Sequence, residues 1–274
     1  MDSLLDSAHP PTSPRGRCIG VFDSGVGGLS VLRALHTQLP HAPLAYVADS
    51  GHAPYGERSV EYVLDRSRRI AAHLLDQGAA GLVVACNTAT AIAVRTLREK
   101  WPSVPIVGVE PGLKPAAATT RNRRIGVMAT TGTLVSNKFQ ALLQSQSQDL
   151  IVLPRACPGL ARLIEQGDLD AQPLRDAIEL HTRELRAARV DTVVLGCTHY
   201  TFVRHHIQTA MGSEVQIIDT ADAVARHAAE QLGSRVAHVD EPITRLHTTG
   251  DANCLRDIAN AWLPFPTTVE RLDV

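Results

Sequence analysis

Two cysteines of this 274-residue sequence stand at the end of apolar, partly β-branched runs. Cys86 follows the run Leu82–Ala85 and precedes an amide and a hydroxyl side chain. Cys197 follows Thr192–Gly196 and precedes a hydroxyl and an imidazole. Such a run is typical of a buried strand of a parallel sheet. We therefore expect each thiol at the carboxyl end of a strand, one in each half of the chain.

Two equivalent thiols suggest acid–base chemistry on the two faces of one carbon. A thiolate on one face can remove a proton while a thiol on the other face returns one, which inverts the configuration. The α-hydrogen of an amino acid is far less acidic than a thiol, whose pKa is roughly 8.5, so fixed hydrogen-bond donors must stabilise the developing negative charge. His199, close to Cys197, and Asp23, on a strand expected beside that of Cys86, are the candidates for tuning the thiols.

Other roles for the cysteines are less well supported. Five cysteines in a chain of this size do not suggest a disulfide scaffold. Cys197 and His199 would supply two ligands to zinc, but no Cys-x-x-Cys spacing accompanies them, and we predict no metal. His205 and His206 are expected on the surface of a helix. The remaining thiols are interpreted as buried and inert: Cys18, Cys157 and Cys254.

The segments that must position these groups alternate between strand and helix patterns. Strands are expected at 18–22, 44–48, 82–85, 104–109, 124–129, 151–153, 190–196 and 215–218, with a further strand and turn within 243–251. Helices are expected from 29, at 60–77, from the first cysteine to 98, and at 158–167, 173–188 and 220–232, the last with Thr220 as N-cap. This alternation predicts parallel sheets with helices on both faces.

We accordingly predict an α/β fold of two pseudo-symmetric domains with mainly parallel sheets flanked by helices. The active site is expected in the cleft between the domains, at the carboxyl ends of the strands. Residues 18–113 and 220–274 would form the first domain, and residues 114–219 the second. Residues 1–17 are rich in Ser and Pro and have no apolar core of a signal peptide, so we expect a disordered tail there.

Composition excludes several classes of partner. The formal net charge of −1 gives no attraction to nucleic acid or to an anionic membrane. No apolar run approaches the roughly 20 residues that a membrane-spanning helix needs. We therefore expect a protein that binds neither nucleic acid nor membrane, in a reducing cytoplasm where thiols stay free.

The glycine-rich turn Asp23–Gly28 lies between a strand and a helix and could hold an anion on its backbone amides. Its spacing is neither that of dinucleotide-binding folds nor a Walker loop. A non-catalytic anion- or nucleotide-binding module built on this turn is a competing hypothesis, and it predicts ligand binding that survives loss of both thiols.

The roles of two further carboxylates stay undecided. Asp49 is either a turn residue or part of the site, and Glu165 is either a solvated helix residue or part of the site.

Six motifs make the chain closely resemble glutamate racemase, of the cofactor-independent aspartate/glutamate racemase superfamily. The resemblance runs from about Gly20 to Asp251. The motifs are Phe22–Leu29, Pro54–Gly56, Ala85–Ala89, Val109–Gly112, Leu195–Tyr200 and Thr248–Asp251. The chain departs from the usual family pattern at 49–54 and at 157–160, neither of which touches a proton-transfer position.

The resemblance implies interconversion of L- and D-glutamate without a cofactor, as a homodimer, to supply D-glutamate for bacterial peptidoglycan. It implies that Cys86 deprotonates D-glutamate and Cys197 deprotonates L-glutamate, assisted by Asp23, His199 and Glu165. A related racemase acting on aspartate or another amino acid is the alternative. The implied substrate contacts are Asp23, Ser24, Tyr55, Gly56, Asn87, Thr88, Thr130, Thr133, Thr198 and His199.

Overall fold

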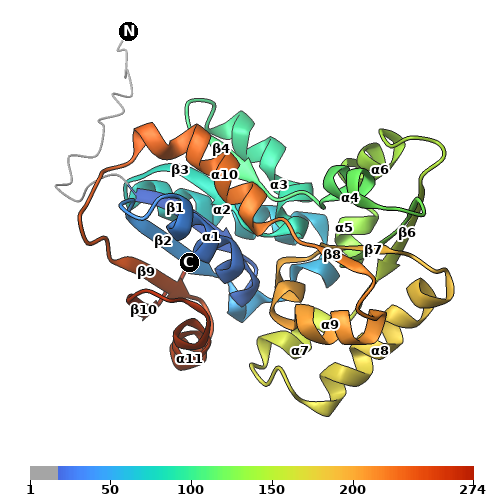
Figure 1. Ribbon diagram of the computed structural model, residues 1–274. Coiled ribbons are helices and arrows are strands. Elements are labelled where there is room, and N and C mark those ends of the chain that lie inside the picture. Colours follow the sequence, from blue (N-terminus) through green and yellow to red (C-terminus); the bar gives the residue numbers. More distant parts are fainter. Residues whose placement is uncertain (1–17) are drawn as a thin grey trace, which may run out of the picture.

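Two parallel β-sheets, each accompanied by helices, make up the computed structural model of the chain (Figure 1). The structure describes residues 18–274, so the tail predicted at 1–17 lies outside the described residues. The first sheet has six strands in the order β10-β9-β2-β1-β3-β4. Its strands are β1 (Cys18–Asp23), β2 (Leu44–Ala48), β3 (Ala79–Val84), β4 (Ile106–Gly108), β9 (Thr244–Thr248) and β10 (Thr267–Arg271).

The second sheet has four strands in the order β6-β5-β7-β8. These are β5 (Arg124–Ala129), β6 (Ile151–Ala156), β7 (Thr192–Gly196) and β8 (Gln216–Ile218). Neighbouring strands pair in parallel throughout both sheets. Strand β6 continues through Pro154, which was not expected in a strand. A proline is tolerated there because β6 is the edge of its sheet and has a strand on one side only.

Eleven α-helices are found in residues 18–274. They are α1 (Leu29–Gln38), α2 (Val60–Asp76), α3 (Asn87–Lys100), α4 (Leu113–Thr119), α5 (Thr131–Leu134), α6 (Asn137–Gln144), α7 (Leu160–Glu165), α8 (Gln172–Ala187), α9 (Arg204–Met211), α10 (Ala221–Leu232) and α11 (Ala252–Trp262). Five short 3₁₀ segments add η1 (Val26–Gly28), η2 (Ser50–His52), η3 (Tyr55–Glu57), η4 (Thr198–Val203) and η5 (Gly233–Arg235).

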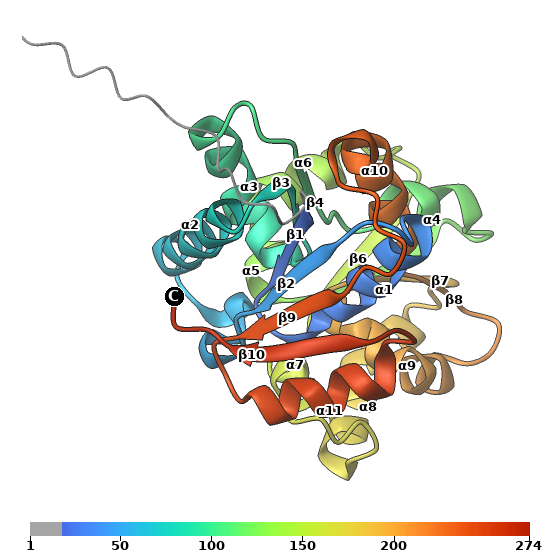
Figure 2. The same cartoon turned by 90° about the vertical axis from the view of Figure 1, so that its left-hand side faces the viewer.

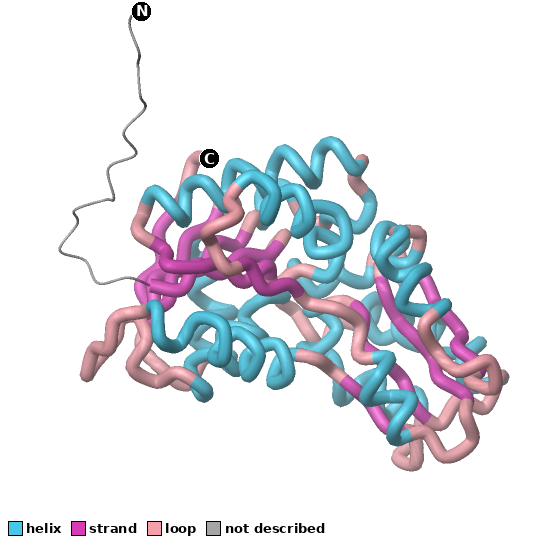
Figure 3. Tube along the Cα trace, turned by 90° about the horizontal axis from the view of Figure 1, so that it is seen from above, coloured by secondary structure: helices cyan, strands magenta, loops and turns pink. Residues whose placement is uncertain are grey.

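The first sheet is covered on both faces, and β1 shows why its sequence is apolar throughout. All six of its residues are buried. Ile19 and Val21 pack into the apolar cluster that includes α1 and α10, whereas Cys18 and Phe22 pack into the cluster of α2 and α3. Because successive side chains of a strand point to opposite faces, a strand between two helix layers needs apolar residues at every position. Figure 2 shows α2 and α3 on one side of the sheet and α1 and α10 on the other, and Figure 3 shows helices on both sides of the strands.

The predicted α/β fold with parallel sheets flanked by helices is confirmed, and most predicted elements differ from the structure by a few residues at their ends. Helix α11 and strand β10 were not predicted. Thr220 is the N-cap residue of α10, as predicted, although its side chain makes no capping hydrogen bond. The domain boundaries remain a prediction. In the described residues no helix is long and apolar enough to cross a membrane.

Candidate active site

The carboxyl ends of strands from both sheets carry the polar groups singled out in the sequence. Asp23 ends β1, while Cys86 and Cys197 follow β3 and β7 within two residues. Thr130 directly follows β5. Parallel strands bring their carboxyl ends to one edge of a sheet. Each of the two sheets therefore has one of the thiols at that edge.

Asp23 connects these two edges. Its Oδ1 accepts hydrogen bonds from the backbone N and the hydroxyl of Ser24, at 2.6 and 3.1 Å. Its Oδ2 accepts from the hydroxyl of Thr198, across 3.0 Å. Burial raises the pKa of the fully buried Asp23 carboxyl, against the opposing attraction of His199. One carboxylate therefore touches residues next to both cysteines.

The Cys86 thiol lies at the N-cap of α3. Its Sγ accepts a hydrogen bond from the backbone N of Ala89 at 3.5 Å and donates one to the hydroxyl of Ser24 at 3.7 Å. The residue is 5% exposed. Burial raises its pKa well above the ordinary value, and the negative charge of Asp23 raises it further. Cys86 is accordingly held as a thiol, the form that can give a proton.

Cys197 has an imidazole beside it. The Sγ of Cys197 lies 3.8 Å from Nδ1 of His199, whose Nε2 is hydrogen-bonded to Oε1 of Glu165. Burial alone would lower the pKa of His199, but its bonds to Cys197 and Glu165 and their negative charges outweigh it and raise that pKa well above the usual value. The raised pKa favours the positively charged imidazole of His199 beside the sulfur of Cys197.

Glu165 is part of this cluster, so the alternative of a solvated helix residue is wrong. Its side chain is 14% exposed at the end of α7. Besides His199, it accepts hydrogen bonds from the backbone N of Val26 at 2.6 Å and from the hydroxyl of Ser50 at 3.1 Å. The carboxylate thus ties the second half of the chain to two loops of the first.

These bonds also weaken the hypothesis of a separate anion site on the glycine-rich turn. Two backbone amides of that turn, those of Ser24 and Val26, already bind the carboxylates of Asp23 and Glu165. The turn does hold anionic groups, as its geometry suggested, but they belong to the protein itself.

The loop that carries Tyr55 and Gly56 is anchored through a buried ion pair. The Tyr55 hydroxyl donates to Oδ2 of Asp49 at 2.5 Å, and Arg66 binds the two oxygens of Asp49 at 2.9 and 2.8 Å. Burial raises the pKa of Tyr55, as does the charge of Asp49. Asp49 is therefore more than a turn residue. Sequence reasoning missed Arg66, because nothing in a helical run of charged residues marks the one that turns inward.

A cluster of threonines joins the two halves next to Gly56. The hydroxyl of Thr88 lies 2.9 Å from that of Thr130 and 3.3 Å from that of Thr133. A Cβ added to Gly56 would lie 2.5 Å from Cβ of Thr130, so the backbone approaches the second half closely there. Hydroxyls rotate to suit a partner and can turn toward a carboxylate.

Asn87, between Cys86 and the threonine cluster, has an unused donor. Its Nδ2 is buried and has no hydrogen-bond partner in the described part of the chain. A buried donor without a partner costs about 1–3 kcal/mol, which a bound carbonyl or carboxylate oxygen would recover. Among the predicted substrate contacts, the unpartnered Nδ2 of Asn87 is the atom that points most directly to a bound ligand.

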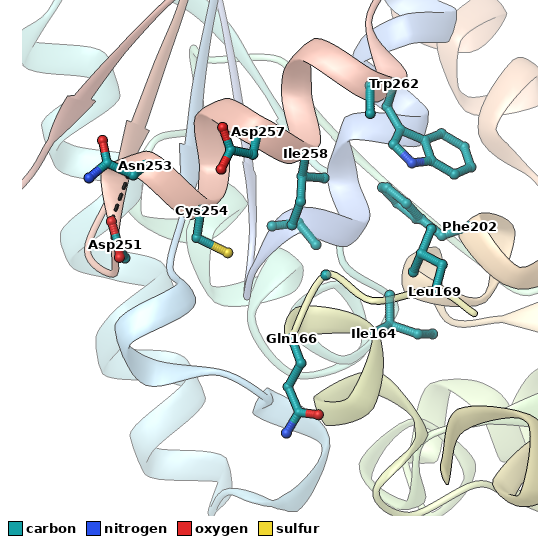
Figure 4. Close-up of a pocket in the computed structure, with 13 residues that line it drawn as sticks. Ile164, Gln166, Leu169, Phe202, Asp251, Asn253, Cys254, Asp257, Ile258 and Trp262 are labelled. Atoms are coloured by element: carbon teal, nitrogen blue, oxygen red, sulfur yellow. Dashed lines mark hydrogen bonds between the residues drawn. The ribbon is translucent and has the colours of Figure 1, made fainter. Parts of the chain in front are cut away.

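The two thiols are enclosed in this structure. Cys86 is 5% exposed and Cys197 7%. A cavity of about 10 Å³ beside Gly56, Thr130 and Cys157 has room for no more than about one water, and neither of the two thiols lines it. A cavity of about 520 Å³ lies elsewhere, between α7 and α11, and its lining contains neither thiol (Figure 4). Cys254 lines that cavity and is half-buried, whereas the sequence predicted a buried thiol.

Comparison with known proteins agrees with the fold and identifies the family. Residues 19–228 match the model of the Asp/Glu/Hydantoin racemase family. The chain belongs to this family, which confirms the resemblance found in its sequence. It is 50% identical to glutamate racemase of Ectopseudomonas mendocina over 235 residues, 85% of this chain and 89% of that protein. It is 51% identical to glutamate racemase of Pseudomonas aeruginosa over 217 residues, 79% and 82% of the two chains.

Solved structures of glutamate racemases share its fold. One isoform from Bacillus anthracis superposes with a TM-score of 0.84 at 34% identity, covering 94% of this chain and 98% of that one. The Escherichia coli enzyme, crystallised with L-glutamate and the activator UDP-MurNAc-Ala, gives 0.84 at 29% identity, covering 94% and 99%.

Proposed function

We propose that this chain is a glutamate racemase that interconverts L- and D-glutamate by a two-base mechanism. The observation that carries the proposal is the pair of enclosed thiols with opposite surroundings: Cys86 beside Asp23, and Cys197 beside His199. The names of relatives at about 50% identity support glutamate as the substrate over aspartate.

In the L-to-D direction, the thiolate of Cys197 removes the α-proton and the electron pair stays on the α-carbon. The thiol of Cys86 then protonates the opposite face, which leaves a thiolate at Cys86 and a thiol at Cys197. The reverse reaction starts from this state, so the two cysteines exchange roles between directions.

His199 and Asp23 support the two proton transfers. The charged imidazole of His199 stabilises the thiolate of Cys197, and Glu165 holds that imidazole in place through its other nitrogen. Asp23 raises the proton affinity of Cys86, which favours the thiol before protonation of the substrate.

Donors around the thiols suit a substrate with two carboxylates. The amide of Asn87 follows Cys86 directly and has no partner in the described residues, and the hydroxyls of Thr88, Thr130 and Thr133 form one hydrogen-bonded cluster. The hydroxyls of Ser24 and Thr198 both bind Asp23. We infer that these groups, with Tyr55 and Gly56, hold the substrate. Since the thiols are enclosed, the two halves must separate for glutamate to enter. D-glutamate for peptidoglycan, a cytoplasmic location and a homodimer remain predictions.

The test is racemase activity of the purified chain on L-glutamate, D-glutamate and L-aspartate without pyridoxal phosphate, in deuterium oxide. We expect turnover of both glutamate enantiomers, incorporation of solvent deuterium at the α-carbon of the product, and a kcat/KM for aspartate at least about 100-fold lower. Comparable rates on aspartate would favour the alternative substrate. Product formed without solvent deuterium would contradict proton exchange through thiols.

A further inference from the structure

A second cluster of ligating side chains lies away from the thiols. It consists of Asp170, in the loop between α7 and α8, and of His205 and His206, at the start of α9. One ligand atom from each residue lies within 4.8 Å of the others. The family function assigns nothing to these residues.

The distances within the cluster are those of ligands around one ion. Nε2 of His206 lies 3.1 Å from Oδ1 of Asp170. The same Nε2 hydrogen-bonds the backbone O of Leu169 at 2.9 Å, a bond that it would give up on binding an ion. The rings of His205 and His206 lie with their centroids 3.8 Å apart and their planes tilted by 42°. Ligand atoms at about 2.0–2.1 Å from a tetrahedral zinc ion stand about 3.3 Å from one another. Small side-chain rotations would therefore bring all three residues to bonding distance.

The chemistry of the set selects the kind of ion. Two imidazole nitrogens and one carboxylate oxygen suit Zn²⁺ and its neighbours Co²⁺ and Ni²⁺, whereas Ca²⁺ and Mg²⁺ require oxygen ligands. Three protein ligands leave a fourth position for water. The Asp170 side chain is 79% exposed, so an ion reaches it directly from solvent. Arg175 is the nearest cation in the described contacts of Asp170, at 4.0 Å, too far to hold the carboxylate firmly.

We propose that Asp170, His205 and His206 form a binding site for a divalent transition-metal ion of the zinc class. The site joins the loop after α7 to the start of α9. Glu165 ends α7 and His199 lies in η4, directly before α9. The two segments thus meet twice, at the hydrogen bond between His199 and Glu165 and at the metal site. A bound ion would fix the contact at the metal site and so restrain the hydrogen bond between His199 and Glu165.

The test is isothermal titration of the full-length, untagged, reduced protein with zinc chloride. The variant Asp170→Asn/His205→Ala changes two exposed residues, so its fold is expected to be kept, and circular dichroism verifies this. His206→Gln serves as a second, independent variant. The matched control is His227→Ala, because His227 is an exposed helical histidine beside a single carboxylate, that of Glu230 at 3.7 Å. Thiols elsewhere in the chain are common to all four proteins and cancel in the comparison.

We expect the wild type and His227→Ala to bind one equivalent of zinc more than either of the other variants. Saturating zinc should raise the Tm of the wild type by roughly 5 °C above its effect on those variants. With cobalt, the difference spectrum between wild type and variant should show visible bands of nitrogen and oxygen ligation without a thiolate charge-transfer band. Equal stoichiometry in wild type and both variants, or a thiolate band in the difference spectrum, would overturn the proposal.

Discussion

The hydroxyl of Thr198 donates a hydrogen bond to Asp23 across 3.0 Å, although 175 positions separate the two residues. Thr198 follows a strand of the four-stranded sheet, and Asp23 ends a strand of the six-stranded one. The other oxygen of Asp23 binds Ser24, which accepts the bond from Cys86. The surroundings of the two thiols therefore share one buried carboxylate, and a change at either thiol should be felt at the other.

Replacing either thiol by a hydroxyl should abolish efficient racemisation. A serine hydroxyl is a much weaker acid than a thiol and does not ionise near neutral pH, so it can neither give nor take the proton efficiently. Cys86→Ser and Cys197→Ser should therefore each lower kcat/KM by roughly 10²- to 10⁴-fold. The loss must be equal in the two directions, because enantiomers have equal free energy and the equilibrium constant is one. Steady-state assays of both variants on L- and D-glutamate measure it.

The direction-specific role of each cysteine appears in the isotope effect. With Cys197→Ser, removal of the α-proton from L-glutamate becomes the slow step, so α-deuterated L-glutamate should show a larger primary isotope effect than α-deuterated D-glutamate. Cys86→Ser should show the reverse. Cys254→Ser is the control and should keep the parental rate, since its half-buried thiol contacts only the backbone O of Glu165, at 4.0 Å, and a serine hydroxyl can keep that contact. Parental activity in either active-site variant would disprove the two-base mechanism.

Glu165→Gln should shift the pH dependence of the reaction to lower pH. The glutamate carboxylate helps to hold the pKa of His199 well above its usual value, and a neutral amide removes that charge. The imidazolium is then lost at lower pH, so the alkaline limb of the kcat/KM profile should move downward. Loss of a charge-assisted hydrogen bond of about 1.5–3 kcal/mol predicts a decrease of roughly 10- to 100-fold. The pH–rate profile and an NMR titration of His199 measure the two effects.

The hydrogen bond between His199 and Glu165 makes the unfolding free energy depend on pH. A histidine whose pKa is raised on folding contributes its full stability below the pKa of the unfolded chain, about 6.5, and loses it as pH rises through the raised value. The difference in unfolding free energy between wild type and Glu165→Gln should therefore be largest in mildly acidic solution and shrink above neutrality. A difference that grows with pH would show that His199 is neutral in the folded protein.

Breaking the Asp49–Arg66 pair should destabilise the fold and weaken the binding of glutamate through Tyr55. Their side chains are 0% and 7% exposed, so Arg66→Met leaves a buried carboxylate without its partner, at a cost of about 3–5 kcal/mol. KM for glutamate should rise, because Asp49 also positions Tyr55. Asp65→Asn is the matched control: it breaks an Asp–Arg pair on the same helix whose side chains are both 59% exposed, and should change stability by less than about 1 kcal/mol. Urea unfolding compares them, and equal losses would contradict a special role for the buried pair.

The sequence predicted what depends on local pattern. Strand β1 and the cysteine strands were found because strands between helix layers are apolar at nearly every position. The site set could be assembled because parallel strands gather their carboxyl ends. Contacts between residues far apart in the chain could not be predicted. Nothing in the position of Glu165 or Arg66 in the sequence indicates that Glu165 binds His199 and that Arg66 binds Asp49. Helix α11 was missed although its apolar residues follow a clear helical period, because no segment beyond the turn at 243–251 was assigned. Strand β10 is a partly exposed strand at the edge of its sheet, where the apolar pattern of a buried strand is absent.

Gly27→Ala should disable the site while most of the fold survives. A Cβ at Gly27 would lie 2.4 Å from Nδ1 of His199, the atom that faces Cys197, and 2.7 Å from the hydroxyl of Thr198. Both side chains must move, so kcat/KM should fall at least about 100-fold, with an overpacking cost of about 1–3 kcal/mol in unfolding free energy. Gly233→Ala is the control, because its nearest neighbour would be Leu39 at 3.6 Å, an ordinary contact. If Gly27→Ala kept parental kcat/KM, the close packing of His199 against the glycine turn would have no part in catalysis.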